Sequence, residues 1–194
     1  MTAAVDASYD GPALLTFGHG TASAEQMLAV LGGAGVGLVV DVRRFPGSRR
    51  HPHVATAELE RWLPAGGVDY RWAPALGGRR RVPSDEPEAD PWWRVEAFRA
   101  YAAHTRTAEF RAGMAELLAD VGSRPPASVA VMCSETVWWR CHRRIISDVA
   151  VLLHGVAVRH LGHDGRTTGH PPSAGARVSP HGLRYDVVDE PPAD

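Results

Sequence analysis

The chain has 194 residues, of which 44% are hydrophobic and 22% are charged, and its formal net charge is −1. This length and composition are typical of one folded domain with a sizeable core. We expect no contact with a membrane, because no apolar run approaches the ~20 residues that a transmembrane helix needs. The near-zero net charge excludes a strong global attraction for nucleic acid.

Cysteine and lysine usage narrows the chemistry further. The two cysteines, Cys133 and Cys141, lie too close in sequence for a disulfide framework, and the N-terminus has no secretory pattern, so we expect a cytoplasmic protein. All 21 basic residues are arginine. The absence of lysine excludes a lysine Schiff base and a P-loop lysine.

Apolar runs and helical spacing alternate along the chain. Short apolar runs bounded by glycine or proline predict strands at residues 13–17, 36–42, 68–72, 129–132, 156–161 and 183–188. Apolar residues at helical spacing predict helices that begin near Ser23, Thr56 and Thr107, a short helix around Phe98 and Tyr101, and a helix around Ile145 and Leu152. This alternation predicts an α/β fold, a single-domain open, mainly parallel sheet with helices on both faces (Rossmann-like).

The remaining segments are predicted to lie outside these elements. Residues 1–12 are expected to be a flexible N-terminal arm, 13–188 the single α/β domain and 189–194 a C-terminal tail. Residues 162–180 are rich in glycine, proline, serine and threonine and are predicted to be a loop. Trp92 and Trp93 either anchor a proline-rich loop in the core or offer a stacking surface, and we favour the anchor.

The stretch from Val129 to Asp148 carries most of the reactive side chains. It begins as a buried strand and ends in a helix, and the turn between them holds both cysteines, a carboxylate, two tryptophans, a histidine and several arginines. Such a turn lies at the carboxyl edge of a parallel sheet, where open α/β folds bind ligands. The alternative is that the cysteines and tryptophans are core residues and the arginines are a solvated helix start.

A second group of polar residues follows the second predicted strand. Asp41 ends an apolar run and needs partners, because burying a lone carboxylate is costly. It either pairs with a neighbouring arginine to fix the loop or takes part in chemistry. The arginines around it predict a phosphate or anion site, since the guanidinium fork suits phosphate oxygens. An ordinary solvated loop is the alternative.

Because parallel strand ends meet at one edge, these groups predict an active site. The candidate catalytic residues are Glu135, Asp41, His19 and His142. The candidate phosphate-binding residues are Arg43, Arg44, Arg49, Arg50, Arg79, Arg80, Arg140 and Arg143. The candidate base-stacking residues are Tyr70, Trp72, Trp138 and Trp139. We expect Glu135 to lie at or just before a helix N-terminus, which would favour its charged form.

The same region of the sequence also offers ligands for a metal and thiols for catalysis. Candidate metal ligands are Cys133, Cys141, His142, His19, His51 and His53. The cysteines are not in a C-x₂-C arrangement and the arginines oppose a cation, so we predict neither a metal nor a cofactor. As a candidate thiol, Cys141 is expected to have a lowered pKa beside arginines. Cys133 ends the strand and could face the core or the site, and we favour a small buried apolar residue. Since successive helical residues point apart, Cys141 and His142 are not expected to form a dyad.

Five short motifs, taken together, resemble the domain-of-unknown-function 488 family. They are Gly18-His-Gly20, the segment from Asp41 to Arg49, the segment from Ala75 to Arg80, Met132-Cys-Ser-Glu135 and Cys141-His-Arg143. The resemblance runs in order from about Leu14 to Leu161. It implies a compact α/β domain and a site at these motifs, without a particular reaction. The family's usual first motif is Gly-His-Ser, so Gly20 departs from it and is assigned no hydrogen-bonding role.

We therefore expect an enzyme that acts on nucleic acid, in particular DNA, or on a nucleotide. Its most specific form is a monofunctional DNA glycosylase-like hydrolase that removes a modified base during DNA repair. The arginines would hold phosphates, and Asp41 and Glu135 would divide the stabilisation of the sugar cation and the activation of water. Two alternatives stay open. One is a cysteine-dependent enzyme on a small anionic substrate, and the other is a non-catalytic nucleic-acid-binding module.

Overall fold

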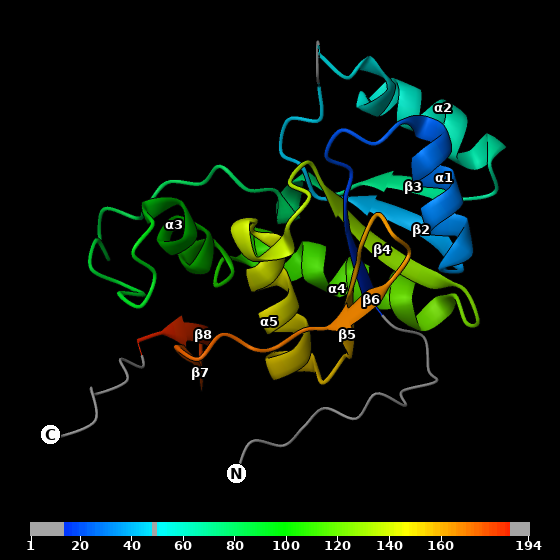
Figure 1. The fold of residues 1–194 in the computed structure, drawn as a ribbon. Helices are drawn as coiled ribbons and strands as arrows, with labels where there is room; N and C mark the ends of the chain where they lie inside the picture. The colour runs from blue at the N-terminus through cyan, green and yellow to red at the C-terminus, as the bar shows by residue number, and fades with distance from the viewer. Residues whose placement is uncertain (1–13, 48–49, 187–194) are drawn as a thin grey trace, which may run out of the picture.

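Six strands form the central sheet in the order β3-β2-β4-β1-β5-β6 (Figure 1). The computed structural model describes residues 14–47 and 50–186, so the predicted N-terminal arm and C-terminal tail lie outside the described residues. The strands of this sheet are β1 (Leu14–Gly18), β2 (Val36–Asp41), β3 (Asp69–Trp72), β4 (Ser128–Cys133), β5 (Val158–Leu161) and β6 (Thr167–Gly169). The first five are parallel and β6 is antiparallel to β5, which confirms the predicted mainly parallel α/β sheet.

Five α-helices and three short 3₁₀ helices connect the strands. They are α1 (Ala24–Gly33), η1 (Pro52–Val54), α2 (Thr56–Ala65), η2 (Pro74–Leu76), α3 (Glu96–His104), α4 (Ala108–Ser123), η3 (Trp138–Arg140) and α5 (Arg143–His154). The predicted capping box at the start of α1 is confirmed, because Ser23 and Gln26 bond to each other's backbone N–H groups. Thr107 caps α4 as predicted, since its hydroxyl accepts from the Phe110 N–H.

Helices cover both faces of the sheet, because successive strand residues point to opposite sides (Figure 1). On one face, side chains of β1, β2 and β4 pack against α1 and α2, as Phe17 does against Met27 and Leu59 in one cluster. On the other face, the alternate residues of the same strands pack against α4 and α5, with Val131 in one cluster with Ile145. Both clusters are almost fully buried, which explains the continuous apolar runs of the strands.

The region predicted to be a loop at residues 162–180 contains two strands, so that prediction was wrong there. One is β6, and the other is β7 (Ala176–Ser179), which pairs with β8 (Gly182–Tyr185) in a separate two-stranded sheet. The predicted last strand is therefore not an edge of the main sheet. These strands have three or four residues and few apolar side chains, so they give no alternating signal.

The hairpin of β7 and β8 packs on the α5 side of the molecule, near α3 (Figure 1). Trp93 lies between these parts, stacked on Phe98 of α3 and in ring contact with Tyr185 of β8. It is 6% exposed. The predicted anchoring role of this tryptophan is thereby confirmed.

Candidate active site

The carboxyl ends of β1, β2 and β4 meet at one edge of the sheet and bring their polar residues together. His19 directly follows β1, Asp41 ends β2, and Cys133 ends β4, which lies between the other two strands. A cleft of about 640 Å³ opens at this edge. His19 and Cys133 line it, together with Glu135 and His142 from the segment after β4. The predicted convergence of strand ends is therefore present.

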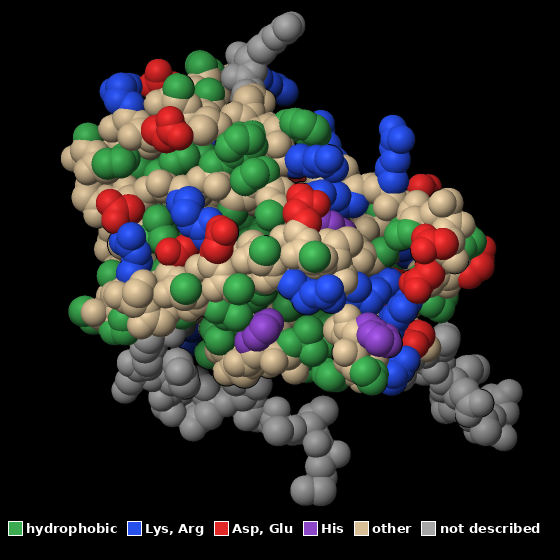
Figure 2. All heavy atoms as spheres, turned by 180° about the vertical axis from the view of Figure 1, so that it is seen from behind, with side chains coloured by type: hydrophobic (Ala, Val, Ile, Leu, Met, Phe, Trp, Pro, Cys, Tyr) green, Lys and Arg blue, Asp and Glu red, His purple; other side chains and the backbone are tan. Residues whose placement is uncertain are grey.

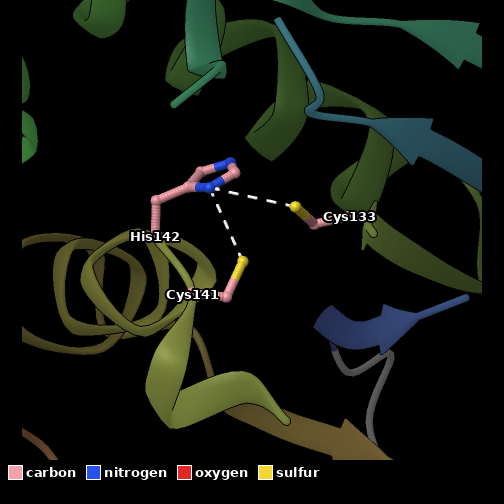
Figure 3. Close-up of side chains that lie close together, drawn as sticks. All are labelled: Cys133, Cys141 and His142. Atoms are coloured by element: carbon pink, nitrogen blue, oxygen red, sulfur yellow. Dashed lines mark hydrogen bonds between the residues drawn. The ribbon is translucent and has the colours of Figure 1, made fainter. Parts of the chain in front are cut away.

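Cys133, Cys141 and His142 form a compact cluster that faces this cleft (Figure 3). The Nδ1 atom of His142 lies 3.9 Å from the Cys133 Sγ and 3.5 Å from the Cys141 Sγ. The other ring nitrogen, Nε2, lies 3.0 Å from the Val42 carbonyl oxygen, which can only accept a hydrogen bond. In the neutral ring the hydrogen is thus on Nε2, and Nδ1 presents its lone pair to both sulfur atoms.

The expectation that Cys141 and His142 point apart was wrong. It assumed a helix through both residues, but α5 begins only at Arg143. Cys141 has an extended backbone, with φ −129° and ψ 153°, whereas His142 is already in the helical region. The change in backbone conformation between the two residues turns both side chains toward Cys133.

Arg143 places a buried positive charge behind the cluster. Its side chain is 1% exposed, and its guanidinium donates to the Cys141 sulfur and to the Glu135 carbonyl oxygen. A hydrogen bond from Cys133 and the charge of Arg143 lower the pKa of Cys141 to about 6. The same hydrogen bond and burial raise the pKa of Cys133. Cys141 is thus the thiolate of the pair and Cys133 the thiol.

Asp41 is fully buried (0% exposed), and its carboxylate accepts hydrogen bonds from two side chains. Arg43 donates to it from Nε at 2.8 Å and from a terminal nitrogen at 2.5 Å, and the Tyr70 hydroxyl donates at 2.9 Å. Arg43 also lies 3.3 Å from His19 Nε2. Burial and the Arg43 charge lower the pKa of His19 to about 4. Of the two readings of Asp41, the geometry favours the ion pair that fixes the loop.

Glu135, unlike the buried Asp41, is exposed and lines the cleft. Arg143 donates a hydrogen bond to the backbone carbonyl oxygen of Glu135. The prediction that it lies at a helix N-terminus was wrong, since an irregular segment and η3 separate it from α5. The dipole of α5 therefore does not act directly on its carboxylate.

The predicted phosphate-binding arginines divide into two groups. Four line the cleft, namely Arg43, Arg44, Arg79 and Arg140. The others lie elsewhere: Arg80 pairs with Glu109 and with backbone carbonyls, Arg143 is buried, Arg50 is exposed outside the lining, and Arg49 is outside the described residues. Because Arg43 is committed to Asp41, the cleft offers Arg44, Arg79 and Arg140 to an anion.

The loop that carries Arg79 approaches the cluster closely. A Cβ atom at Gly78 would lie 3.0 Å from His142 Nδ1, and one at Gly77 would lie 2.8 Å from the Arg44 backbone. Arg79 itself has a positive φ of 56°. The two glycines therefore let this loop cross His142 and Arg44 without a clash, which gives a structural reason for glycine at both positions.

The four aromatic residues predicted to stack on a base lie outside the cleft lining. Tyr70 is bound to Asp41, Trp72 donates to the Arg43 carbonyl, and Trp138 stacks on His160 at 3.9 Å. The aromatic residues that do line the cleft are Phe45, Phe98 and Tyr101. Sequence reasoning missed them because Phe98 and Tyr101 follow a helical core pattern, and Phe45 gives no periodic signal.

Charge on the molecule's surface is mixed. Figure 2, which views the molecule from behind, shows arginine side chains in small groups with acidic side chains beside several of them. Ion pairs of the described residues include Arg71 with Asp120 and Arg184 with Glu86. Each of these pairs neutralises an arginine charge at the surface.

Residues 23–150, about two thirds of the chain, match the model of the family described as "Domain of unknown function DUF488". No curated protein matched the chain significantly, and neither did any solved structure. Within residues 14–47 and 50–186, none of the helices combines the length and apolar character needed to cross a membrane.

Proposed function

The chain belongs to the DUF488 family, and on that basis and the geometry of the cleft we propose that it is an enzyme acting on a phosphate-bearing substrate, either a nucleotide or nucleic acid. One observation carries this proposal. Cys133, Cys141 and His142 open onto the same cleft as Arg44, Arg79 and Arg140. Reactive groups and side chains suited to phosphate oxygens thus face one space.

The specific reaction that we propose is hydrolysis of the N-glycosidic bond to a modified base. Glu135 is the carboxylate available to orient the attacking water, because Asp41 is occupied by Arg43 and Tyr70. In this scheme Asp41 is a positioning residue that holds Arg43 beside His19. The absence of lysine implies release of the base without lysine-dependent strand cleavage.

The test is release of free base from duplex DNAs that carry different modified bases, followed by mass spectrometry. We expect release by the wild-type protein and loss of at least about a hundredfold in Glu135→Gln, in line with the usual effect of removing a general base. Glu58→Gln is the matched control, since Glu58 lies on α2 and pairs with Arg61. Full activity of Glu135→Gln on the true substrate would contradict the glycosidic mechanism.

A second candidate function is nucleophilic catalysis by Cys141 on a small anionic substrate. It is favoured by the contact of the Cys141 sulfur with both the Arg143 guanidinium and His142 Nδ1. Activity of this kind would disappear in Cys141→Ser and survive in Glu135→Gln. A non-catalytic nucleic-acid-binding module would instead show salt-dependent affinity in both variants and no turnover of any substrate.

A further inference from the structure

The cluster of Cys133, Cys141 and His142 has the donor set of a metal site. Two thiolates and one imidazole nitrogen are the ligands that zinc accepts in a tetrahedral site. The three ligand atoms all lie within 4.8 Å of one another. We propose that this cluster binds one Zn²⁺ ion through the two sulfur atoms and His142 Nδ1, and that the fourth coordination position opens onto the cleft.

The distances fit this ion. With Zn–S bonds of about 2.3 Å and Zn–N bonds of about 2.0–2.1 Å, a tetrahedral site separates sulfur and nitrogen ligand atoms by about 3.6 Å. The two nitrogen-to-sulfur distances in this protein are 3.5 Å for Cys141 and 3.9 Å for Cys133. Both distances lie within about 0.3 Å of the tetrahedral value.

The surroundings of His142 are those of a metal ligand. A ligating histidine commonly donates its second ring N–H to a carbonyl or carboxylate, which fixes the tautomer and aims the free nitrogen at the ion. In this protein, Nε2 of His142 donates to the Val42 carbonyl at 3.0 Å, and Nδ1 faces the two sulfur atoms (Figure 3). The hydrogen bond also ties the start of α5 to the residue after β2.

Two further features favour the ion: Gly78 leaves space beside His142, and the charges around the site are balanced. Gly78 crosses above His142, and a side chain there would lie 3.0 Å from the proposed ligand atom Nδ1. Arg143 donates from Nε to the Cys141 sulfur at 3.5 Å. Two thiolates balance the charge of Zn²⁺, and the hydrogen bond from Arg143 supports the deprotonated sulfur. Binding releases the thiol proton of Cys133 to solvent.

All three ligands come to the cleft surface, so the fourth position faces solvent or substrate. Three protein ligands and one open position distinguish catalytic zinc sites from closed structural ones. This inference deepens the proposed function and rests on it, because the ion would supply an activated water at the place where Arg44, Arg79 and Arg140 hold the substrate. It also implies that Cys141 works as a ligand and not as a nucleophile.

The test uses the full chain, freed of metal with a chelator and then titrated with Zn²⁺ or Co²⁺. We expect one ion per chain by elemental mass spectrometry, thiolate-to-cobalt charge-transfer absorption in the near ultraviolet, and protection of both thiols from a thiol reagent. Cys133→Ser, Cys141→Ser and His142→Gln should each weaken binding by at least about a hundredfold, more than the loss seen when an outer-shell partner is removed. His154→Gln, at an exposed histidine at the end of α5, is the matched control.

Circular dichroism and thermal melting of each variant separate loss of the site from loss of the fold. Two reactive thiols and no charge-transfer band in the folded wild-type protein would overturn the inference, as would equal binding by the cysteine variants. Turnover that persists in metal-free protein would overturn the role of the ion in supplying an activated water but would leave the proposed function standing. Conversely, metal bound at one ion per chain, with no turnover of any nucleotide or nucleic acid, supports the site and contradicts the proposed function.

Discussion

Arg43 turns back on Asp41, two residues earlier in the chain, and binds its carboxylate from Nε and a terminal nitrogen while both side chains are buried. A charge removed from water in this way is tolerated because its partner is adjacent, and loss of one partner leaves the other uncompensated. This pair therefore bears on stability, whereas the exposed Glu135 does not.

Asp41→Asn should destabilise the protein by about 3–5 kcal/mol, because it leaves the Arg43 guanidinium buried without a carboxylate. Glu135→Gln should change the free energy of unfolding by no more than about 0.5 kcal/mol, as is usual for an exposed side chain. Urea unfolding monitored by circular dichroism measures both. A stable but inactive Asp41→Asn variant would instead indicate that Asp41 takes part directly in the chemistry.

In metal-free protein, Cys141 should react with iodoacetamide far faster than Cys133 at neutral pH. The lowered pKa of Cys141 makes it a thiolate above about pH 6, whereas the raised pKa of Cys133 keeps that residue a thiol. Peptide mass spectrometry of partly alkylated protein assigns each site.

Replacing Cys133 tests the cause of this difference. Cys133→Ala removes the hydrogen bond to the Cys141 sulfur, so the pH at which Cys141 becomes reactive should rise. Cys133→Ser keeps a donor and should shift it less. If both variants react at the same pH as the wild type, the Cys133 thiol does not determine the ionisation of Cys141.

The free energy of unfolding should fall as the pH decreases below about 6.5. Burial lowers the pKa of His160 to about 3, and burial with Arg43 lowers that of His19 to about 4. Between these values and 6.5 the unfolded chain binds protons that the folded histidines do not, so acid favours unfolding. Each such histidine contributes a slope of at most about 1.4 kcal/mol per pH unit.

Urea unfolding at a series of pH values measures this slope. His160→Asn should be less stable at neutral pH, because it loses contacts with Thr16, His170 and Trp138, but its stability should depend less on pH. His154→Gln serves as the exposed control. An unchanged slope in His160→Asn would mean that His160 is not the residue that resists protonation.

Arg140→Met should weaken binding of a labelled single-stranded oligonucleotide at every sequence tested. Removing one phosphate contact should also reduce the slope of log affinity against log salt concentration by about 1 or less. Fluorescence anisotropy over a range of sodium chloride concentrations measures both quantities. Arg61→Met, on the outer surface of α2, should leave them unchanged. Equal losses in the two variants would indicate binding by net charge and not by the cleft.

The order of elements and the position of the site were predictable, because they depend on local patterns. Short apolar runs predicted β1, β2 and β4, and parallel strands necessarily bring their carboxyl ends to one edge. The capping residues of α1 and α4 were predictable from the sequence for the same reason, since a cap acts within four residues of its own position.

The inner geometry of the site was not predictable from spacing. Whether Cys141 faces His142 depends on the backbone angles of one residue, and the sequence pattern indicated a helix there. Likewise, Arg143 and Arg140 are both arginines near one turn, yet one is buried and the other lines the cleft. Such differences arise from tertiary packing, which local propensity does not contain.

The position of β4 between β1 and β2 has a consequence for how the protein assembles. The first two strands, although adjacent in sequence, do not pair with each other and are joined only through β4. A nascent chain that has not yet reached residue 128 lacks this central strand, so β1 and β2 have no parallel neighbour in common. The strand that aligns them is the one that carries Cys133. The centre of the sheet and the edge that carries Cys133 are therefore joined by the same strand, through contacts more than a hundred residues apart in sequence for β1 and about ninety for β2.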